Sequence, residues 1–260
     1  MGHGIAQVCA MAGYRVRLTD ADPEGLKRGV AAIARNLAKG IERGKVTEEE
    51  RDAALARLST VDGPAAVAED ADIVFEAIPE KLDLKQGLFR DLEGVATPGC
   101  IFATNTSSLS ISRIAEAVSD PGRVIGTHFF NPAHIMKLLE VVVSDATRPA
   151  VLDAVRVLGE RIGKEVITVR DVPGFATSRL GICLGMEAIR MVEQGVASAE
   201  DIDKAMVHGY RHPVGPLRLG DLVGLDVRMA VGEYLSRELN NPAFEPPALL
   251  REMVARGDLG

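Results

Sequence analysis

The chain has 260 residues, 47% of them hydrophobic, and a formal net charge of −7. This length allows one large domain or two modest ones, and so acidic a chain lacks the basic footprint of a general nucleic-acid-binding protein. No apolar run approaches the roughly 18 residues that a membrane span needs. The three cysteines, Cys9, Cys100 and Cys183, form neither a metal-binding pattern nor a disulfide framework, which indicates a reducing compartment such as the cytoplasm.

Patterns of helices and strands alternate over residues 1–170, which predicts a parallel β-sheet covered by helices. The predicted helices span 4–11, 23–43, 47–58, 82–95, 111–118 and 150–162, and the predicted strands span 14–19, 73–77, 101–104, 124–127, 139–143 and 166–169. The segment Thr47-Glu48-Glu49-Glu50 has the spacing of a capping box.

The segment Asp171-Val172-Pro173-Gly174 interrupts this alternation, and no strand pattern follows it. The predicted helices beyond it span 175–193, 198–208, 225–238 and 248–256. We therefore predict an α/β domain over residues 1–170 and a small all-helical domain over residues 171–260.

A histidine and a glutamate stand in the otherwise apolar stretch 126–141, GTHFFNPAHIMKLLEV. His128 follows a short apolar run, and Glu140 lies inside a β-branched one. A carboxylate in such a run rarely stays ionised without a partner, and a carboxylate that orients an imidazole forms part of a general base. A structural ion pair between two strands is the alternative interpretation.

Three features of the first domain indicate a dinucleotide site. The start Met1-Gly2-His3-Gly4 leads directly into a helix, whose amides and dipole suit a pyrophosphate. Asp20 ends the next strand, 18 residues past Gly2, where an acidic residue binds the ribose of NAD and repels the extra phosphate of NADP. Glu80 and Lys85 follow the strand 73–77, at the edge where such sheets bind ligands. Packing glycines and a turn or cap role for Asp20 are the alternatives.

Residues 25–45 carry a net charge of +5 within this acidic chain. The positions are Lys27, Arg28, Arg35, Lys39, Arg43 and Lys45, against Glu42 alone. A solvated helix face is one interpretation. A surface that binds the phosphates of a polyanionic carrier is the other.

Other polar residues are less informative. His208 and His212 have a metal-like spacing, but Gly209 and Pro213 argue against a continuous helix through them, so no metal site is predicted. His134 is expected on a loop or rim. The segment Thr104–Ser108 follows a strand and is either a polar loop that caps the next helix or a source of hydroxyl contacts to a ligand.

Together these segments resemble the 3-hydroxyacyl-CoA dehydrogenase family, of the 3-hydroxybutyryl-CoA dehydrogenase type. The matching motifs are MGHGIAQ, ATNTSSLSI (103–111), GTHFFNPAHIMKLLEV (126–141), PGFATSRL (173–180) and the PVGP…DLVGLD pattern within 201–225. The resemblance covers essentially the whole chain, and HFFNP…MKLLEV is its most specific part. It implies a Rossmann-type doubly wound sheet that binds NAD, followed by a helical domain that carries the dimer interface of a cytoplasmic homodimer.

The resemblance also implies roles for individual residues. His128 would be the catalytic base and Glu140 its partner, while Asn131 and Ser107 would contact the substrate. The residues that would touch NAD are Gly2, Asp20, Glu80 and Lys85, and Asn36 and Arg43 would lie near the CoA nucleotide.

The chain departs from the family pattern in three places. The family's first strand and first two fingerprint glycines are absent, and the closing Lys- and Gly-rich segment is missing, so we expect a longer functional protein. Ser178 replaces the Asn that many relatives carry after PGF, so a hydroxyl stands where they have an amide.

The implied activity is oxidation of an L-3-hydroxyacyl-CoA to a 3-oxoacyl-CoA with NAD, or the reverse, in fatty-acid or butanoate metabolism. A related dehydrogenase acting on a free hydroxy acid or a carnitine-like substrate is one alternative. A non-catalytic fragment or binding module is another. Retention of His128, Asn131 and Glu140 favours the enzyme.

Overall fold

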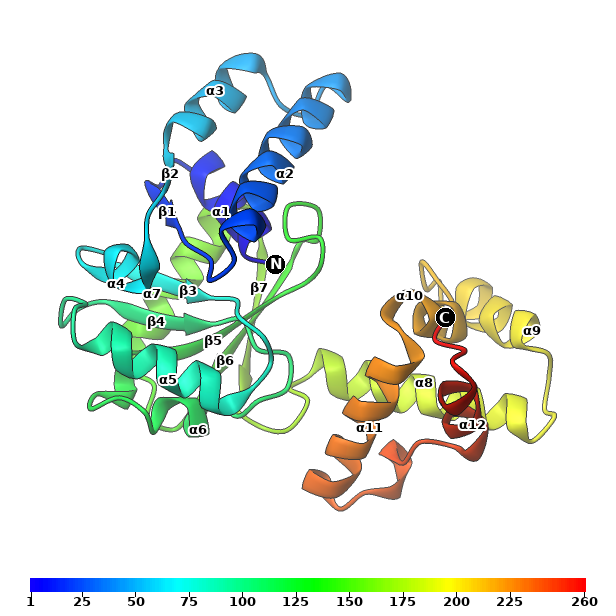
Figure 1. Cartoon of the computed structure of the whole chain (residues 1–260). Helices are drawn as coiled ribbons and strands as arrows, with labels where there is room; N and C mark the ends of the chain where they lie inside the picture. Colours follow the sequence, from blue (N-terminus) through cyan, green and yellow to red (C-terminus); the bar gives the residue numbers. More distant parts are fainter. The chain divides into compact units, whose positions relative to one another are not determined.

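The computed structural model describes all residues, Met1–Gly260, which form two compact units, Met1–Asp171 and Val172–Gly260 (Figure 1). The first unit alternates strands and helices, and the second contains helices alone. The predicted fold class, a Rossmann-type α/β unit followed by a helical one, is confirmed. No helix in either unit is both long and apolar enough to cross a membrane.

The first unit contains seven strands and seven α-helices. Its strands are β1 (Val16–Leu18), β2 (Leu58–Thr60), β3 (Ile73–Glu76), β4 (Ile101–Thr104), β5 (Val124–Phe129), β6 (Leu138–Val143) and β7 (Glu165–Arg170). Its helices are α1 (Gly2–Met11), α2 (Pro23–Glu42), α3 (Glu48–Ala56), α4 (Gly63–Ala68), α5 (Leu82–Glu93), α6 (Ile111–Ala115) and α7 (Pro149–Arg161), with a 3₁₀ turn η1 (Pro121–Arg123).

The strands form two separate sheets. β1 and β2 pair in parallel, and β3 to β7 form a five-stranded sheet in chain order. All neighbours in the larger sheet are parallel except β5 and β6, which are antiparallel. The prediction of a purely parallel sheet was therefore wrong at this pair. The physical reason is the short link between β5 and β6, since a parallel crossover needs a dozen or more residues.

Helices cover both faces of the five-stranded sheet. α1 and α7 supply Ile5, Val8, Val155 and Leu158 to the main core, where they pack with Ala103 of β4 and with residues of β5 and β6. The neighbouring β4 residue, Phe102, points to the opposite face and contacts Phe89 of α5, with ring centroids 5.2 Å apart. Both sides of the sheet are thus buried, and its carboxyl edge is where polar groups gather.

One local expectation needed correction around β2. Residues 57–58 were predicted to continue the third helix, but α3 ends at Ala56 and Leu58 begins β2. The β-branched and apolar residues of β2 are few, so the pairing with β1 decides its conformation rather than its own pattern. The capping box is confirmed, because Thr47 accepts from the Glu50 amide while the Glu50 carboxylate accepts from the Thr47 amide.

The second unit packs its helices around an apolar core of seven buried residues: Ile182, Met186, Ile189, Leu225, Leu235, Phe244 and Leu250. Its elements are α8 (Thr177–Glu193), α9 (Ala199–Lys204), a π-helical turn η2 (Ala205–Gly209), α10 (Pro216–Val223), α11 (Leu225–Leu239), a 3₁₀ turn η3 (Pro242–Phe244) and α12 (Ala248–Arg256). α10 was not predicted. It is a short helix with Pro216 as its first residue, a position that suits proline because its missing N–H has no helical partner there.

Candidate active site

His128 and Glu140 are direct cross-strand partners in the antiparallel β5–β6 pair. The His128 Nδ1 lies 2.9 Å from Oε2 of Glu140, which is 0% exposed, and His128 itself is 7% exposed. The imidazole also packs on Phe130, with centroids 4.5 Å apart. Because a carboxylate can only accept, the geometry assigns the Nδ1 proton to the bond with Glu140 and directs proton transfer to Nε2.

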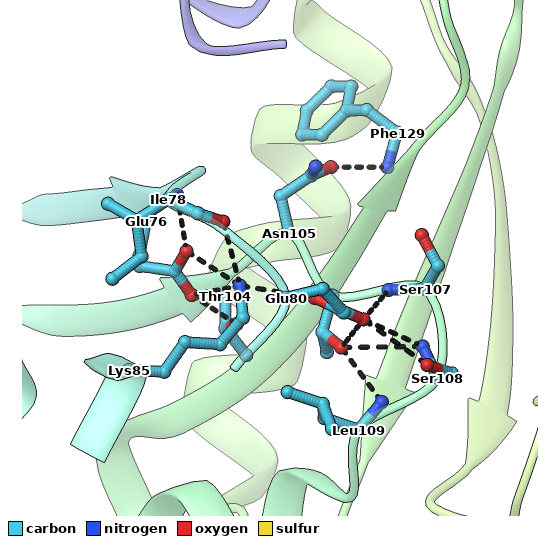
Figure 2. Close-up of polar contacts among 11 residues, drawn as sticks. Glu76, Ile78, Glu80, Lys85, Thr104, Asn105, Ser107, Ser108, Leu109 and Phe129 are labelled. Carbon is cyan, nitrogen blue, oxygen red and sulfur yellow. Dashed lines mark hydrogen bonds and ion pairs between the residues drawn. The ribbon is translucent and has the colours of Figure 1, made fainter. Parts of the chain in front are cut away.

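The loop 104–109, between β4 and α6, connects this pair to the neighbouring strands. The Asn105 amide N–H donates to the carbonyl of Glu76 at 2.8 Å, and its side-chain oxygen accepts from the Phe129 amide at 2.9 Å. Figure 2 shows Asn105 reaching toward Phe129, the residue that follows His128. The loop therefore fixes the end of β5 beside the imidazole.

Glu80 holds the other side of the same loop (Figure 2). Its Oε1 accepts from the Thr106 hydroxyl at 2.5 Å and from the amides of Ser107 and Ser108 at 2.8 and 3.1 Å. Partial burial raises the pKa of Glu80, but the Thr106 hydrogen bond, the Lys85 charge and the two amides outweigh it and hold the pKa below its usual range. Glu80 is therefore an ionised group at the sheet edge, with its side chain 38% exposed.

Glu76 and Lys85 form a second buried charge pair beneath Glu80. The Lys85 ammonium donates to the two Glu76 oxygens at 2.7 and 2.9 Å, and both side chains are 0% exposed. The same ammonium lies 3.3 Å from Oε2 of Glu80. Lys85, which was expected to touch the cofactor, is 0% exposed and contacts Glu76 and Glu80.

Ser107 and Asn131 both lie on exposed loops at the ends of strands. Ser107 follows β4 in the loop held by Glu80. Asn131 follows β5, two residues beyond its last residue, and precedes a cis peptide bond to Pro132. The first unit therefore presents both candidate substrate-contacting groups on the loops that begin beside His128.

The groups expected to bind a dinucleotide also lie at strand and helix ends. Gly2 is the exposed first residue of α1, whose first turn carries no acidic side chain. A Cβ on Gly4 would lie 3.1 Å from that of Ala133, so this glycine lets α1 approach the 130–137 loop closely. Asp20 is exposed after β1, and its Oδ1 accepts from the Asp22 amide at 2.9 Å, which is the turn role. These placements fit a pyrophosphate at the α1 terminus and a ribose near Asp20.

The basic residues of α2 and of the turn that follows it fall into two groups. Lys27 and Arg28 form ion pairs with Glu24 and Asp22, each at 2.8 Å. The remaining cations of this cluster, Arg35, Lys39, Arg43 and Lys45, are all exposed. Asn36 is half-buried, and its amide donates to Gln7 of α1 at 3.1 Å. The structure does not bring Asn36 or Arg43 against the His128–Glu140 pair.

The remaining candidates lie elsewhere. His208 belongs to η2, which ends at Gly209, and His212 lies in the following loop. No group of three or more metal-binding side chains gathers anywhere in the structure. His134 lies on the 130–137 loop, where burial and the nearby Lys164 charge lower its pKa. Ser178 lies in the first turn of α8.

The sequence analysis missed two groups that organise this edge. One is Glu76, whose signal was present, because a carboxylate ends the apolar run of β3 just as Glu140 interrupts that of β6. The other is Asp171, which accepts from Ser110, Ile111 and Ser112 at the start of α6. The cap of α6 was expected within Thr104–Ser108, but Ser110 is the N-cap residue.

Known proteins are similar to this chain in sequence and in overall fold. Residues 1–172 match the family described as 3-hydroxyacyl-CoA dehydrogenase, NAD binding domain, and residues 174–260 match its C-terminal domain. The probable 3-hydroxybutyryl-CoA dehydrogenase of Bacillus subtilis is 42% identical over 260 residues, which cover 100% of this chain and 90% of that protein. The 3-hydroxybutyryl-CoA dehydrogenase of Mycobacterium tuberculosis is 40% identical, with 100% and 91% covered.

A solved structure agrees. The crystal structure of (S)-3-hydroxybutyryl-CoA dehydrogenase from Ralstonia eutropha superposes with a TM-score of 0.96 at 40% identity, over 100% of this chain and 92% of the other. Both family domains are matched in order, and together they span nearly every residue. The chain therefore belongs to the 3-hydroxyacyl-CoA dehydrogenase family, as an NAD-dependent enzyme of that family.

Proposed function

We propose that the chain oxidises the 3-hydroxyl of an L-3-hydroxyacyl-CoA with NAD, or runs the reverse reduction, with His128 as the general base. The observation that carries this proposal is the buried His128–Glu140 pair. Nδ1 of His128 on β5 lies 2.9 Å from Oε2 of Glu140 on β6. An ion pair that only links two strands does not need a cation that changes charge near neutral pH. An imidazole, the side chain that changes charge near neutral pH, suits proton transfer.

Each residue of the pair has a distinct role. Nε2 of His128 takes the proton of the substrate hydroxyl, while Glu140 holds the ring in one tautomer and stabilises the imidazolium that forms. Because Glu140 is 0% exposed, little water screens this stabilisation. NAD, when bound, supplies the hydride acceptor. Ser107 and Asn131 orient the substrate by hydrogen bonds to its 3-oxygen or its thioester carbonyl.

The cofactor site that we propose combines three surfaces of the first unit. The N-terminus of α1 at Gly2 binds the pyrophosphate through its amides, and the exposed Asp20 carboxylate accepts from the adenosine ribose. Glu80 lies at the carboxyl edge of β3 with its carboxylate ionised and partly exposed. This arrangement supports NAD over NADP, because a carboxylate repels the additional phosphate.

We assign binding of the CoA moiety of the substrate to the exposed cations on α2 and at its C-terminal end. Arg35, Asn36 and Lys39 lie on α2, which packs on α1, and Arg43 caps the C-terminus of α2. A CoA nucleotide carries several phosphate charges, and exposed Lys and Arg side chains attract such groups. Lys27 and Arg28 take less part, because local carboxylates already pair with them.

A homodimer in the cytoplasm is the assembly that we propose. Leu180, Tyr210 and Leu222 of the helical unit are 71%, 76% and 71% exposed, and contact with a second copy would remove such side chains from water. Cys9, Cys100 and Cys183 are all free thiols, which supports a reducing compartment. Light scattering of the purified chain tests the dimer, and a mass of one protomer at micromolar concentration would contradict it.

The substrate class is tested by following NADH formation with matched alcohols. We expect turnover of L-3-hydroxybutyryl-CoA and not of its D-enantiomer, of free 3-hydroxybutyrate or of carnitine. Comparable kcat/KM on the free acid or on carnitine would favour a dehydrogenase of the same architecture with another substrate. No turnover of any alcohol, together with no NAD-induced rise in melting temperature, would favour a binding module.

A further inference from the structure

Lys85 is a fully buried ammonium that lies between two carboxylates. Its Nζ donates to both oxygens of Glu76, at 2.7 and 2.9 Å, and lies 3.3 Å from Glu80. A third contact reaches the carbonyl of Ile78 at 3.4 Å. With 0% of its surface exposed, the ammonium of Lys85 is enclosed by these three groups.

Glu76 has no room for a ligand either. Besides Lys85, its Oε1 accepts from the Ile78 amide at 2.7 Å, and its Oε2 accepts from the Thr104 hydroxyl at 2.6 Å. Both carboxylate oxygens are therefore occupied by donors from the segment after β3, from β4 and from α5. Figure 2 shows Glu76 and Lys85 together on the buried side of the sheet edge, with Glu80 beyond them.

Glu80 divides its two oxygens between the buried pair and the loop. Oε2 faces Lys85, whereas Oε1 accepts from Thr106, Ser107 and Ser108. The Lys85 charge thus holds one oxygen while the other organises the loop that carries Ser107. A free Glu side chain would lose rotamer entropy on taking up this position, and the buried ammonium compensates for that cost.

We propose that Glu76 is a positioning residue: it anchors Lys85, and Lys85 fixes the carboxylate of Glu80 and the loop 104–109 for cofactor and substrate. The ligand-binding roles of Glu80 and Ser107 rest on the proposed function, whereas the order of the loop does not. Glu76 acts at a distance from any ligand, and its effect passes through a single ammonium.

Three variants separate positioning from mere stability. Glu76→Gln keeps an oxygen that can accept from the Ile78 amide and gains an N–H that can donate to the Thr104 hydroxyl, but it leaves Glu80 as the one carboxylate beside Lys85. Lys85→Met keeps an unbranched chain and leaves Glu76 unpaired. The double variant, Glu76→Gln with Lys85→Met, contains neither buried charge. Lys81→Met is the matched control, because Lys81 is an exposed lysine one turn away from Lys85.

The thermal melts and the loop are expected to respond differently. Each single variant lowers the melting temperature by roughly 10 °C, because it removes one member of the fully buried Glu76–Lys85 pair and leaves the other. The double variant recovers most of that loss. Hydrogen exchange of the Ser107 and Ser108 amides nevertheless becomes about tenfold faster in all three variants, since Glu80 holds these amides and its anchor is weakened in each. Lys81→Met changes neither quantity.

Kinetics give a second readout of the same proposal. We expect KM for NAD to rise about tenfold in Lys85→Met and in the double variant, with a smaller change in kcat. Lys85 helps to keep the pKa of Glu80 low, so its removal raises that pKa. The loss of NAD affinity on acidification should then begin at a higher pH.

The two proposals fail in distinguishable ways. If the double variant regains wild-type amide exchange and the wild-type KM for NAD along with its melting temperature, the pair is only structural and the positioning role is wrong. If the wild-type chain does not oxidise 3-hydroxyacyl-CoA, the proposed function is wrong, and the exchange rates of Ser107 and Ser108 still decide the positioning role.

Discussion

Two regions of the first unit use charge in opposite ways. At the carboxyl edge of the five-stranded sheet, Glu140 and the Glu76–Lys85 pair are almost free of solvent, and each has a partner within 3 Å. Lys39 on α2 and Arg43 at its C-terminus are exposed, so they can interact with charged ligands from solution. The members of a buried pair interact at hydrogen-bond distance. The attraction of an exposed cation for a ligand extends over a screening length of about 8–10 Å.

This difference assigns the reaction to the buried pairs and the attraction of charged ligands to the exposed cations. A buried pair keeps a fixed geometry and a low local dielectric, so removing one member changes the reaction itself. An exposed cation is replaced by water and counter-ions at little cost, so its removal changes only how well a charged ligand is attracted. Substitutions in the two regions should therefore differ in magnitude and in salt dependence.

His128→Gln is the change with the largest expected effect. Glutamine retains a polar side chain but cannot take a proton, so kcat should fall by about 10²–10⁴-fold, the usual contribution of a general base. Steady-state oxidation of L-3-hydroxybutyryl-CoA measures this. The affinity for NAD should stay near the wild-type affinity, as measured by the rise in melting temperature that NAD causes.

The outcome bears directly on the comparison. A His128→Gln enzyme that keeps wild-type turnover would show that the buried pair is a structural link between β5 and β6. Loss of NAD binding together with turnover would mean that the substitution disturbed the whole edge, and would not support a catalytic base.

Glu140→Gln removes the charge and retains the shape. The amide oxygen can still accept from Nδ1, but no anion faces the imidazolium, so kcat should fall by roughly 10²-fold with a smaller change in KM. Equal kcat in Glu140→Gln and wild type would limit this carboxylate to a packing role.

The sequence carried enough information for the general architecture and for the central pair. The periodicity located every strand of the larger sheet, because buried parallel strands are continuous apolar runs bounded by turns. His128 and Glu140 were paired on composition alone, since a carboxylate within β-branched residues needs a partner. Their direct opposition in register was not predictable, because the antiparallel turn of the chain at 130–137 decides it.

The network around Glu80 was the part that sequence could not supply. Lys85 was assigned to the cofactor because a helix position near a sheet edge does not reveal which way a long side chain points. Its burial depends on Glu76 and Thr104, from two other strands, and such contacts exist only after the sheet has formed. The Asp171 cap of α6, 59 to 61 residues distant in the chain, was equally invisible.

Asp20 combines properties of both regions. It is exposed, like the cations of residues 25–45, but we expect it to make one specific hydrogen bond, as a buried group does. Asp20→Ala should reduce the preference for NAD over NADP by about tenfold, because a hydrogen bond to a charged group is lost and a repulsion is relieved. The ratio of kcat/KM for the two cofactors measures it, and an additional Arg nearby should extend the change. An unmutated enzyme that favours NADP would contradict this assignment.

The smallest effect is expected on α2, where it is also the most sensitive to salt. Lys39→Glu with Arg43→Glu should raise KM for acyl-CoA by roughly fivefold and leave KM for NAD nearly unchanged, because long-range attraction of the CoA phosphates is reversed. Wild-type KM for acyl-CoA should itself rise with ionic strength. The matched control, Lys27→Glu with Arg28→Glu, makes the same charge change on the same helix at positions already paired with Glu24 and Asp22. A control variant with the same rise in KM would mean that only the net charge of the helix matters, and equal effects on both ligands would leave α2 as a solvated face.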